Sequence, residues 1–218
     1  MINFTNVCHS YKTSKGKNII FNNLSFQIIK GEKVGIIGQN GAGKSTLLRL
    51  LGDVEKPSSG NIERNMSVSW PLAFGGAFQG SLSGLDNTRF ICRVYNRPLE
   101  GAEAFIQNFA ELGDYYYEPV KSYSSGMRAK LAFGISMLID FDCYLIDEIT
   151  AVGDAKFQQK CEYELWDRKS SSAMVIVSHD ENVIRNRCSK VILLEKDKYT
   201  EFTDIDHAFY VYNTNSNL

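Results

Sequence analysis

The first part of the chain alternates apolar and polar positions in two runs, over about residues 2–29, and the alternation ends at Lys30-Gly31. Successive side chains of a β-strand point to opposite faces, so a period of two predicts strands with one buried face. Two such runs before a glycine turn predict a small antiparallel sheet. A short apolar run at 34–37 then predicts a buried strand. After the turn at 57–60, a further strand is expected at about 61–69.

Helical spacing begins after the first buried strand. The helix predicted at 44–51 has three leucines on one face, Leu47, Leu48 and Leu51. A helical period returns over about 85–112, where the inward positions are expected to be Phe90, Val94, Phe105, Phe109 and Leu112. The helix predicted at 126–139 carries Leu131, Ile135 and Leu138 on one face.

In the last third of the chain, predicted strands and helices alternate. The strands are expected at 143–146, 174–177 and 191–194, and the helices at 156–169 and near residue 182. Such alternation predicts an α/β fold, in which helices cover a parallel sheet.

Composition and charge restrict the partners. The 218 residues are 44% hydrophobic and carry a net charge of -1, as in an ordinary globular protein and without the basic excess of a nucleic-acid binder. A signal peptide is not expected, and every apolar run is far shorter than the ~18 residues that cross a bilayer. Any membrane role is therefore expected to depend on a partner. The five cysteines are dispersed, which predicts neither a zinc site nor a disulfide framework.

A glycine-rich segment joins the strand at 34–37 to the helix at 44–51. It reads Gly38, Gln39, Asn40, Gly41, Ala42, Gly43, Lys44 and Ser45, and continues into Thr46. The pattern is that of a phosphate-binding loop, in which glycines let backbone N–H groups face phosphate oxygens at the start of a helix. Lys44 would contact the β- and γ-phosphates, and Ser45 would ligate Mg²⁺. The alternative, a glycine turn without a ligand, does not explain the strand–loop–helix context.

Two further strands are followed by polar groups that suit nucleotide chemistry. Asp147 and Glu148 follow the strand at 143–146, where Asp147 would hold Mg²⁺ and Glu148 would polarise the attacking water. Taken alone, they could equally be two solvated charges. His179 follows the strand at 174–177, at the edge where ligands bind in α/β folds, and could donate a hydrogen bond to the γ-phosphate.

A short serine-rich segment precedes the helix at 126–139. Ser124, Ser125 and Gly126 at a helix N-terminus could hold an anion with their backbone N–H groups. Serine is also a common capping residue, so a plain helix cap explains the same pattern.

Taken in this order, the four features resemble the ABC ATPase family over nearly the whole chain. The glycine-rich loop and Asp147-Glu148 resemble its Walker A and Walker B motifs. The resemblance implies that 123–127 is the signature segment, although only Ser124 and Gly126 match it. It further implies that His179 is the switch histidine, that Asp154 is the acid of the D-loop, and that Tyr11 stacks on adenine.

The family's Q-loop departs from the pattern here. Gln79, the candidate magnesium ligand and sensor, comes later than expected after the strand at 61–69, and the stretch 70–80 could be only a packed loop. The surrounding segments nevertheless resemble bacterial capsular polysaccharide exporters, namely those at 69–74, 76–82, 90–93, 121–127 and 151–154. That resemblance implies a peripheral subunit on the cytoplasmic face of an inner membrane. Related O-antigen exporters append a carbohydrate-binding domain, which is not expected here because little sequence follows the last predicted helix.

The expected protein is therefore an α/β P-loop ATPase with a parallel core sheet and an N-terminal antiparallel β subdomain. A helical subdomain is expected to be inserted at about 70–139 of a single 1–218 domain. ATP and Mg²⁺ are the expected cofactors. The expected partners are a second copy in an ATP-bound dimer and a membrane permease, with a polysaccharide as the indirect substrate and no nucleic acid. The aromatic stretch 70–84 would either contact the permease or belong to the core.

Two rival functions match the sequence less well, because the interval between the loop and the signature is short and the cassette is single. A soluble ABC protein of DNA repair would carry a long coiled coil between the loop and the signature, and one of translation would carry two cassettes. A P-loop kinase would transfer phosphate to an acceptor and would not need the segments at 123–127 and 150–154.

Overall fold

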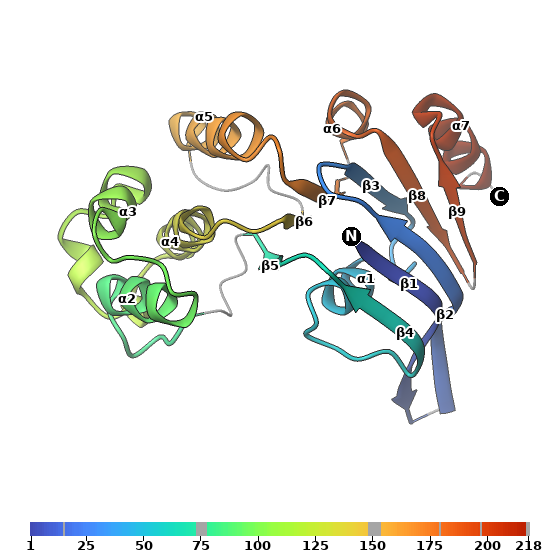
Figure 1. The fold of residues 1–218 in the computed structure, drawn as a ribbon, viewed down its shortest axis with the longest axis horizontal. Coiled ribbons are helices and arrows are strands. Elements are labelled where there is room, and N and C mark those ends of the chain that lie inside the picture. Colours follow the sequence, from blue (N-terminus) through green and yellow to red (C-terminus); the bar gives the residue numbers. More distant parts are fainter. Residues whose placement is uncertain (15, 73–77, 148–153, 179, 197, 217–218) are drawn as a thin grey trace. The chain divides into compact units, whose positions relative to one another are not determined.

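The computed structural model describes the whole chain except residues 15, 73–77, 148–153, 179, 197 and 217–218 (Figure 1). Backbone contacts divide the chain into two compact units. The first unit consists of Met1–Pro71, Phe141–Glu148 and Ser171–Leu218. The second unit consists of Leu72–Asp140 and Ile149–Ser170. The second unit therefore includes a late segment in addition to the inserted stretch.

The N-terminal sheet of the first unit is antiparallel, as the alternation predicts. Its strands are β1 (Ile2–Thr13), β2 (Gly16–Ile28) and β4 (Ser59–Arg64), in the order β2-β1-β4. Ile2 and Phe4 are buried, and after a register shift the buried positions become Val7 and His9. Asn6 has a φ of 51° at this shift. The bulge adds one residue to the strand, so that the odd-numbered side chains after it occupy the face that the even-numbered side chains occupy before it.

The second sheet of this unit forms the parallel core. Its order is β5-β6-β7-β3-β8-β9, with all neighbouring strands parallel except the antiparallel β8 and β9. Their bounds are Val68–Pro71, Cys143–Asp147, Ala173–Val177, Lys33–Gly38, Lys190–Glu195 and Lys198–Phe202. The expected α/β class is confirmed.

Two details of this sheet differ from the sequence prediction. The single strand expected at 61–69 is two strands, because β4 ends at Arg64 and pairs with β1, whereas β5 starts at Val68 and pairs with β6. The chain therefore passes from one sheet to the other between them. β9 and the last helix were not predicted, since short polar strands and weakly periodic helices give little signal.

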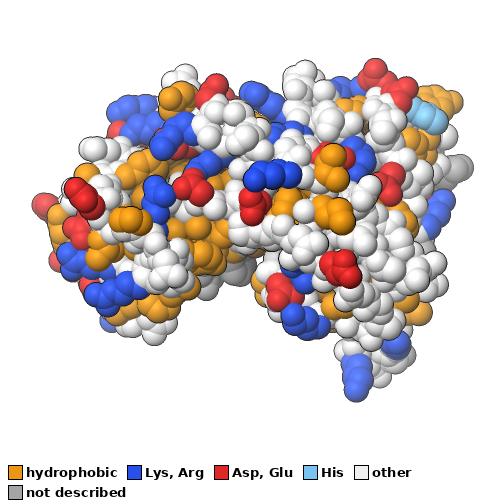
Figure 2. Space-filling view, in the orientation of Figure 1, with side chains coloured by type: hydrophobic (Ala, Val, Ile, Leu, Met, Phe, Trp, Pro, Cys, Tyr) orange, Lys and Arg blue, Asp and Glu red, His pale blue; other side chains and the backbone are white. Residues whose placement is uncertain are grey.

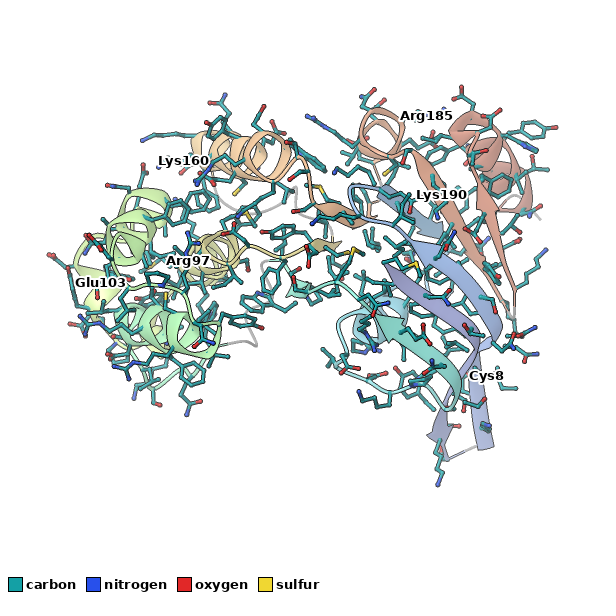
Figure 3. The ribbon with its side chains drawn as sticks, viewed as in Figure 1. Cys8, Arg97, Glu103, Lys160, Arg185 and Lys190 are labelled. Atoms are coloured by element: carbon teal, nitrogen blue, oxygen red, sulfur yellow. The ribbon has the colours of Figure 1, made fainter. Side chains whose placement is uncertain are left out.

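Three helices belong to the first unit: α1 (Lys44–Leu51), α6 (Glu181–Arg187) and α7 (Ile205–Ser216). The leucines of α1 belong to one buried cluster together with apolar residues of both sheets. α7 packs against β8 and β9, whereas α6 contacts α7 and lies over Gly35 of β3 (Figure 1). Arg185 of α6 points toward α7, where it pairs with Asp206 and lies 4.6 Å above the ring of Phe209 (Figure 3).

The helices of the second unit are α2 (Gly84–Val94), α3 (Ala102–Ala110), α4 (Ser125–Leu138) and α5 (Ala155–Glu162). Short 3₁₀ segments lie at Gly113–Tyr117 and Val120–Ser122, and a π-helix continues α5 at Tyr163–Arg168. Aromatic contacts join three of these helices. The ring of Phe109 on α3 stacks on that of Phe133 on α4, with centroids 5.8 Å apart, and meets that of Phe157 on α5 edge-on at 5.2 Å.

The helical period over 85–112 was only partly interpreted correctly. Phe109 and Leu112 are buried as expected, whereas Phe90 and Val94 are 54% and 55% exposed. The period is broken between α2 and α3, so the two helices do not share one continuous face. On α2 the buried hydrophobic side chains are instead Ile91 and Cys92.

Among the residues that the structure describes, every helix is too short or too polar to span a lipid bilayer. Basic and acidic side chains are interspersed on the face shown in Figure 2, in keeping with the net charge of -1.

Gly60, at the start of β4, provides a test of the bulged sheet. Its φ is +83°, and an added Cβ would overlap the carbonyl oxygen of Asn6 at the bulge. We expect Gly60→Ala to lower the free energy of unfolding by about 1–3 kcal/mol for backbone strain, plus about 1–3 kcal/mol for the clash. Gly16→Ala is the control, because Gly16 has a φ of +119° and open space around it. Equal urea midpoints for the two variants would contradict the proposed clash.

Candidate functional site

The glycine-rich loop connects the end of β3 to the start of α1. Three of its residues, Gly38, Gly41 and Gly43, have φ angles of 155°, 85° and 101°. A Cβ on Gly38 would overlap the carbonyl oxygen of Leu194, and a Cβ on Gly43 would lie 2.7 Å from Cγ2 of Ile20. The loop path therefore requires glycine both for its backbone angles and for its close contact with neighbouring strands.

Lys44 lies at the first position of α1 and bends back over the loop. Its ammonium group donates hydrogen bonds to the carbonyl oxygens of Gly38, at 2.7 Å, and Gln39, at 3.1 Å. These contacts hold a positive charge at the mouth of the loop, beside the N-terminus of α1. Both the charge and the helix terminus attract anions.

A hollow of about 290 Å³ opens at this loop. It is lined by Ile20, Asn40, Gly41, Gly43, Lys44, Ser45, Thr46, Asp147 and Val177. Asp147 reaches the hollow from the end of β6, and β7 separates β6 from β3 in the sheet. Parallel strands present their carboxyl ends at one edge, which brings Asp147 to the same hollow as Lys44 and Ser45. The hollow therefore combines an ammonium, a hydroxyl, a carboxylate and a helix N-terminus.

Tyr11 lies next to this hollow but is not one of its lining residues. Its hydroxyl lies 3.4 Å from the Thr46 hydroxyl, donates to Glu55 at 2.6 Å, and accepts from Arg49 at 2.8 Å. Burial of Glu55 favours its neutral form, but the hydrogen bonds from Tyr11 and Arg49 outweigh burial and lower the pKa of this carboxyl. Glu55 is therefore ionised beside the Tyr11 hydroxyl at neutral pH.

The serine-rich segment lies in the second unit, at the start of α4. Ser124 caps this helix, with its hydroxyl accepting from the backbone N–H of Met127 at 3.2 Å. Ser125 and Gly126, in the first turn, are exposed. The capping interpretation and the anion-site interpretation are therefore compatible, because the cap leaves the first turn open to a ligand.

Asp154 also lies in the second unit, where it caps α5. Its carboxylate accepts from the backbone N–H of Phe157 at 2.9 Å and lies 3.5 Å from the ammonium of Lys130 on α4. The hydrogen bond from Phe157, together with Lys130, lowers the pKa of Asp154. This acid is therefore bound to the helix that carries the serine-rich segment.

The remaining predicted site residues are Gln79, Glu148 and His179. Gln79 has an exposed side chain in the second unit, and its backbone exchanges hydrogen bonds with the amide of Asn87 at 3.0 and 3.2 Å. Glu148 and His179 lie outside the described residues. Sequence reasoning missed Ile20 and Val177 in the wall of the hollow, because apolar strand residues carry no distinguishing pattern.

The parallel sheet and its glycine-rich loop define a P-loop nucleotide-binding protein. Residues 21–151 match the ABC transporter family, and the chain belongs to that family as an ATP-hydrolysing subunit.

Relatives agree with this assignment, and a solved structure agrees with the fold. The chain is 52% identical over 213 residues to the ATP-binding protein BexA of Haemophilus influenzae, covering 98% of each chain. It is 51% identical over 214 residues to the capsule polysaccharide export ATP-binding protein CtrD of Neisseria meningitidis, covering 98% of this chain and 99% of that one. The fold matches a dimeric structure of the ATP-binding cassette MJ0796 bound to ADP and Pi, with a TM-score of 0.74 and 22% identity, over 92% of this chain and 98% of that chain.

Lys44 provides a direct test of the hollow. We expect Lys44→Ala to weaken Mg-ATP binding about 10- to 100-fold, since a hydrogen bond to a charged group contributes about 1.5–3 kcal/mol. Isothermal titration calorimetry measures this change. Lys56→Ala is the control, because Lys56 is exposed and paired with Asp53. An unchanged affinity in a folded Lys44→Ala protein would exclude the loop as the binding site.

Proposed function

We propose that this chain powers the export of a capsule-type polysaccharide across a bacterial inner membrane, as the ATPase subunit on its cytoplasmic face. The observation that carries the proposal is the full-length likeness to CtrD, whose name states capsule polysaccharide export, together with the hollow formed by the glycine-rich loop and Asp147. In this proposal the chain supplies ATP hydrolysis, and a separate membrane permease supplies the path for the polymer.

Within the hollow, we assign the phosphates to the glycine-rich loop and Lys44. Ser45 and Asp147 offer a hydroxyl and a carboxylate to the same space, which is the oxygen donor set that Mg²⁺ prefers. These two residues would hold the metal ion, which neutralises phosphate charge when bound. Gln79 is a further candidate ligand, supported only by its amide and its exposure.

For hydrolysis, we assign the general base to Glu148, which directly follows Asp147 in the sequence. A carboxylate at this position can accept a proton from the attacking water. His179 would donate a hydrogen bond to the γ-phosphate, and Lys44 would stabilise the charge that develops there. Tyr11 would stack on the adenine.

A second copy of the chain is proposed to complete each site. The exposed first turn of α4, with Ser124, Ser125 and Gly126, would close over the γ-phosphate bound by the other copy. Asp154, which caps α5, would support this contact through its ion pair with Lys130 of α4. ATP would then join two copies, and hydrolysis would release them, which moves the permease.

The permease is proposed to contact the aromatic stretch 70–84. Of its three candidate anchors, Trp70 is half-buried and packs edge-on against Phe141 at 5.4 Å, Phe78 is half-buried, and Phe74 lies outside the described residues. Cysteine crosslinking between 78–84 and the permease tests this assignment, and crosslinks only to other parts of the subunit would contradict it.

The role of Glu148 predicts a separation of binding from hydrolysis. We expect Glu148→Gln to bind Mg-ATP normally but to hydrolyse it at least about 100-fold more slowly, because an amide cannot accept the proton. The variant should also accumulate as an ATP-bound dimer in size-exclusion chromatography. Glu162→Gln, on α5, serves as the control substitution. Near-normal turnover by Glu148→Gln would reject the assignment.

The physiological task is tested in cells. A strain carrying Lys44→Ala should lose surface capsule and accumulate polysaccharide in the cytoplasm, because Lys44 both holds the phosphates and stabilises the charge that develops during hydrolysis. Immunostaining before and after permeabilisation measures both pools, with a Lys56→Ala strain as the control. Normal surface capsule, with another solute failing to cross the membrane, would assign the chain to a different class of ABC transporter and leave the ATPase function intact.

A further inference from the structure

A closed triangle of hydrogen bonds holds the hydroxyl of Tyr11. This hydroxyl donates to Oε2 of Glu55 at 2.6 Å and accepts from Nη2 of Arg49 at 2.8 Å. The triangle closes through Nε of Arg49, which donates to Oε1 of Glu55 at 2.7 Å. A phenol has one donor and two acceptor sites, so these bonds and the Thr46 hydroxyl at 3.4 Å occupy its bonding capacity.

The ring of Tyr11 is held as well as its hydroxyl. The imidazole of His9 meets it edge-on, with ring centroids 4.9 Å apart and planes at 83°. His9 is only 7% exposed, and its Nε2 lies 3.3 Å from the same Glu55 oxygen that accepts from Tyr11. The hydroxyl bonds and the edge contact act at different points of the ring, so together they restrict both its position and its plane.

The bulge at Asn6 explains why these groups meet. After the register shift, Val7, His9 and Tyr11 continue the strand face that Ile2 and Phe4 occupied before it. His9 and Tyr11 thereby come to Arg49 of α1 and to Glu55, which follows that helix. Thr46 belongs to the same helix and lines the phosphate hollow. The ring of Tyr11 and the phosphate site are therefore attached to one rigid element.

We propose that Arg49, Glu55 and His9 are positioning residues that orient the Tyr11 ring for the nucleotide base, an inference that rests on the proposed role of Tyr11. Stacking on a base requires an aromatic plane at a fixed place and angle. A ring held before the ligand arrives loses less conformational freedom on binding. The three residues would thus set the affinity for the base while contacting no part of the nucleotide themselves.

The competing explanation is that these hydrogen bonds only hold β1 against α1. In that case they would stabilise the glycine-rich loop, and their loss would weaken the binding of any ligand that uses the loop. A ring-orienting role would affect only ligands that carry a base. Inorganic tripolyphosphate offers the phosphate chain without base or ribose, so comparing it with ATP separates the two roles.

The experiment measures the affinity of the full chain for Mg-ATP and for Mg-tripolyphosphate by calorimetry. The variants are Glu55→Gln, which keeps the side-chain size, and Tyr11→Phe, which keeps the ring and removes the hydroxyl. Asp53→Asn is the matched control, because Asp53 is a carboxylate in the same connection that pairs with Lys56 and Arg64 and not with Tyr11.

We expect Glu55→Gln and Tyr11→Phe each to weaken ATP binding about tenfold, which is within the range that one base–aromatic stacking contact contributes. Tripolyphosphate binding should be unchanged in both, and the double variant should be no weaker than either single variant. Asp53→Asn should leave both affinities unchanged. If Glu55→Gln does not fold, Tyr11→Phe and Arg49→Met supply the same comparison.

Three results would overturn the proposal. If Glu55→Gln and Tyr11→Phe lose ATP and tripolyphosphate binding to the same extent, the hydrogen bonds only hold β1 against α1. If both variants bind ATP normally, the ring needs no orientation. Unchanged ATP binding in Tyr11→Ala would show that the ring is not the platform for the base. Failure of the proposed site itself would look different, because the unmodified chain would then bind neither ligand, or Lys44→Ala would bind both normally.

Discussion

The burial of α1 determines where the phosphate-binding loop lies. Leu47, Leu48, Leu50 and Leu51 are buried in the cluster that joins the antiparallel sheet to the core sheet. Burying one leucine contributes about 1.5–3 kcal/mol, so four contribute about 6–12 kcal/mol. That exceeds the few kcal/mol needed to hold a tight loop. The glycines of the loop can therefore adopt their positive φ angles between a buried strand and a buried helix, which place Lys44 and Ser45 at the hollow.

The same helix also organises the groups around the loop. Its first turn carries Ser45 and Thr46 toward the hollow, and its last turn carries Arg49 toward Tyr11 and Glu55. One element therefore supports both the phosphate site and the aromatic ring proposed for the base. In the second unit α4 has a comparable role, because Ser124 caps it while its first turn stays exposed and Lys130 binds Asp154. In each unit a buried helix positions the polar groups at its N-terminus.

Electrostatic pairing near the Tyr11 ring has more effect on orientation than on stability. Surface ion pairs contribute about 0–1 kcal/mol, and Arg49 and Glu55 are 39% and 28% exposed at their side chains. Such a pair adds little to folding compared with the leucines of α1. Its geometric effect is larger, because a hydroxyl bonded at two sides and a ring met edge-on by His9 have few alternative positions.

The sequence by itself determined the features that depend on local pattern. The period of two in the first strands, the buried strand–loop–helix of the phosphate site, and the carboxylate at the end of β6 are each contained in a few consecutive residues. Only the tertiary structure decided which faces are covered. It exposes Phe90 and Val94, divides the expected strand at 61–69 between two sheets, and joins His9 and Tyr11 to Glu55 across the bulge at Asn6. The physical reason is that periodicity reports an amphipathic element, whereas the partner that buries its face comes from a distant part of the chain.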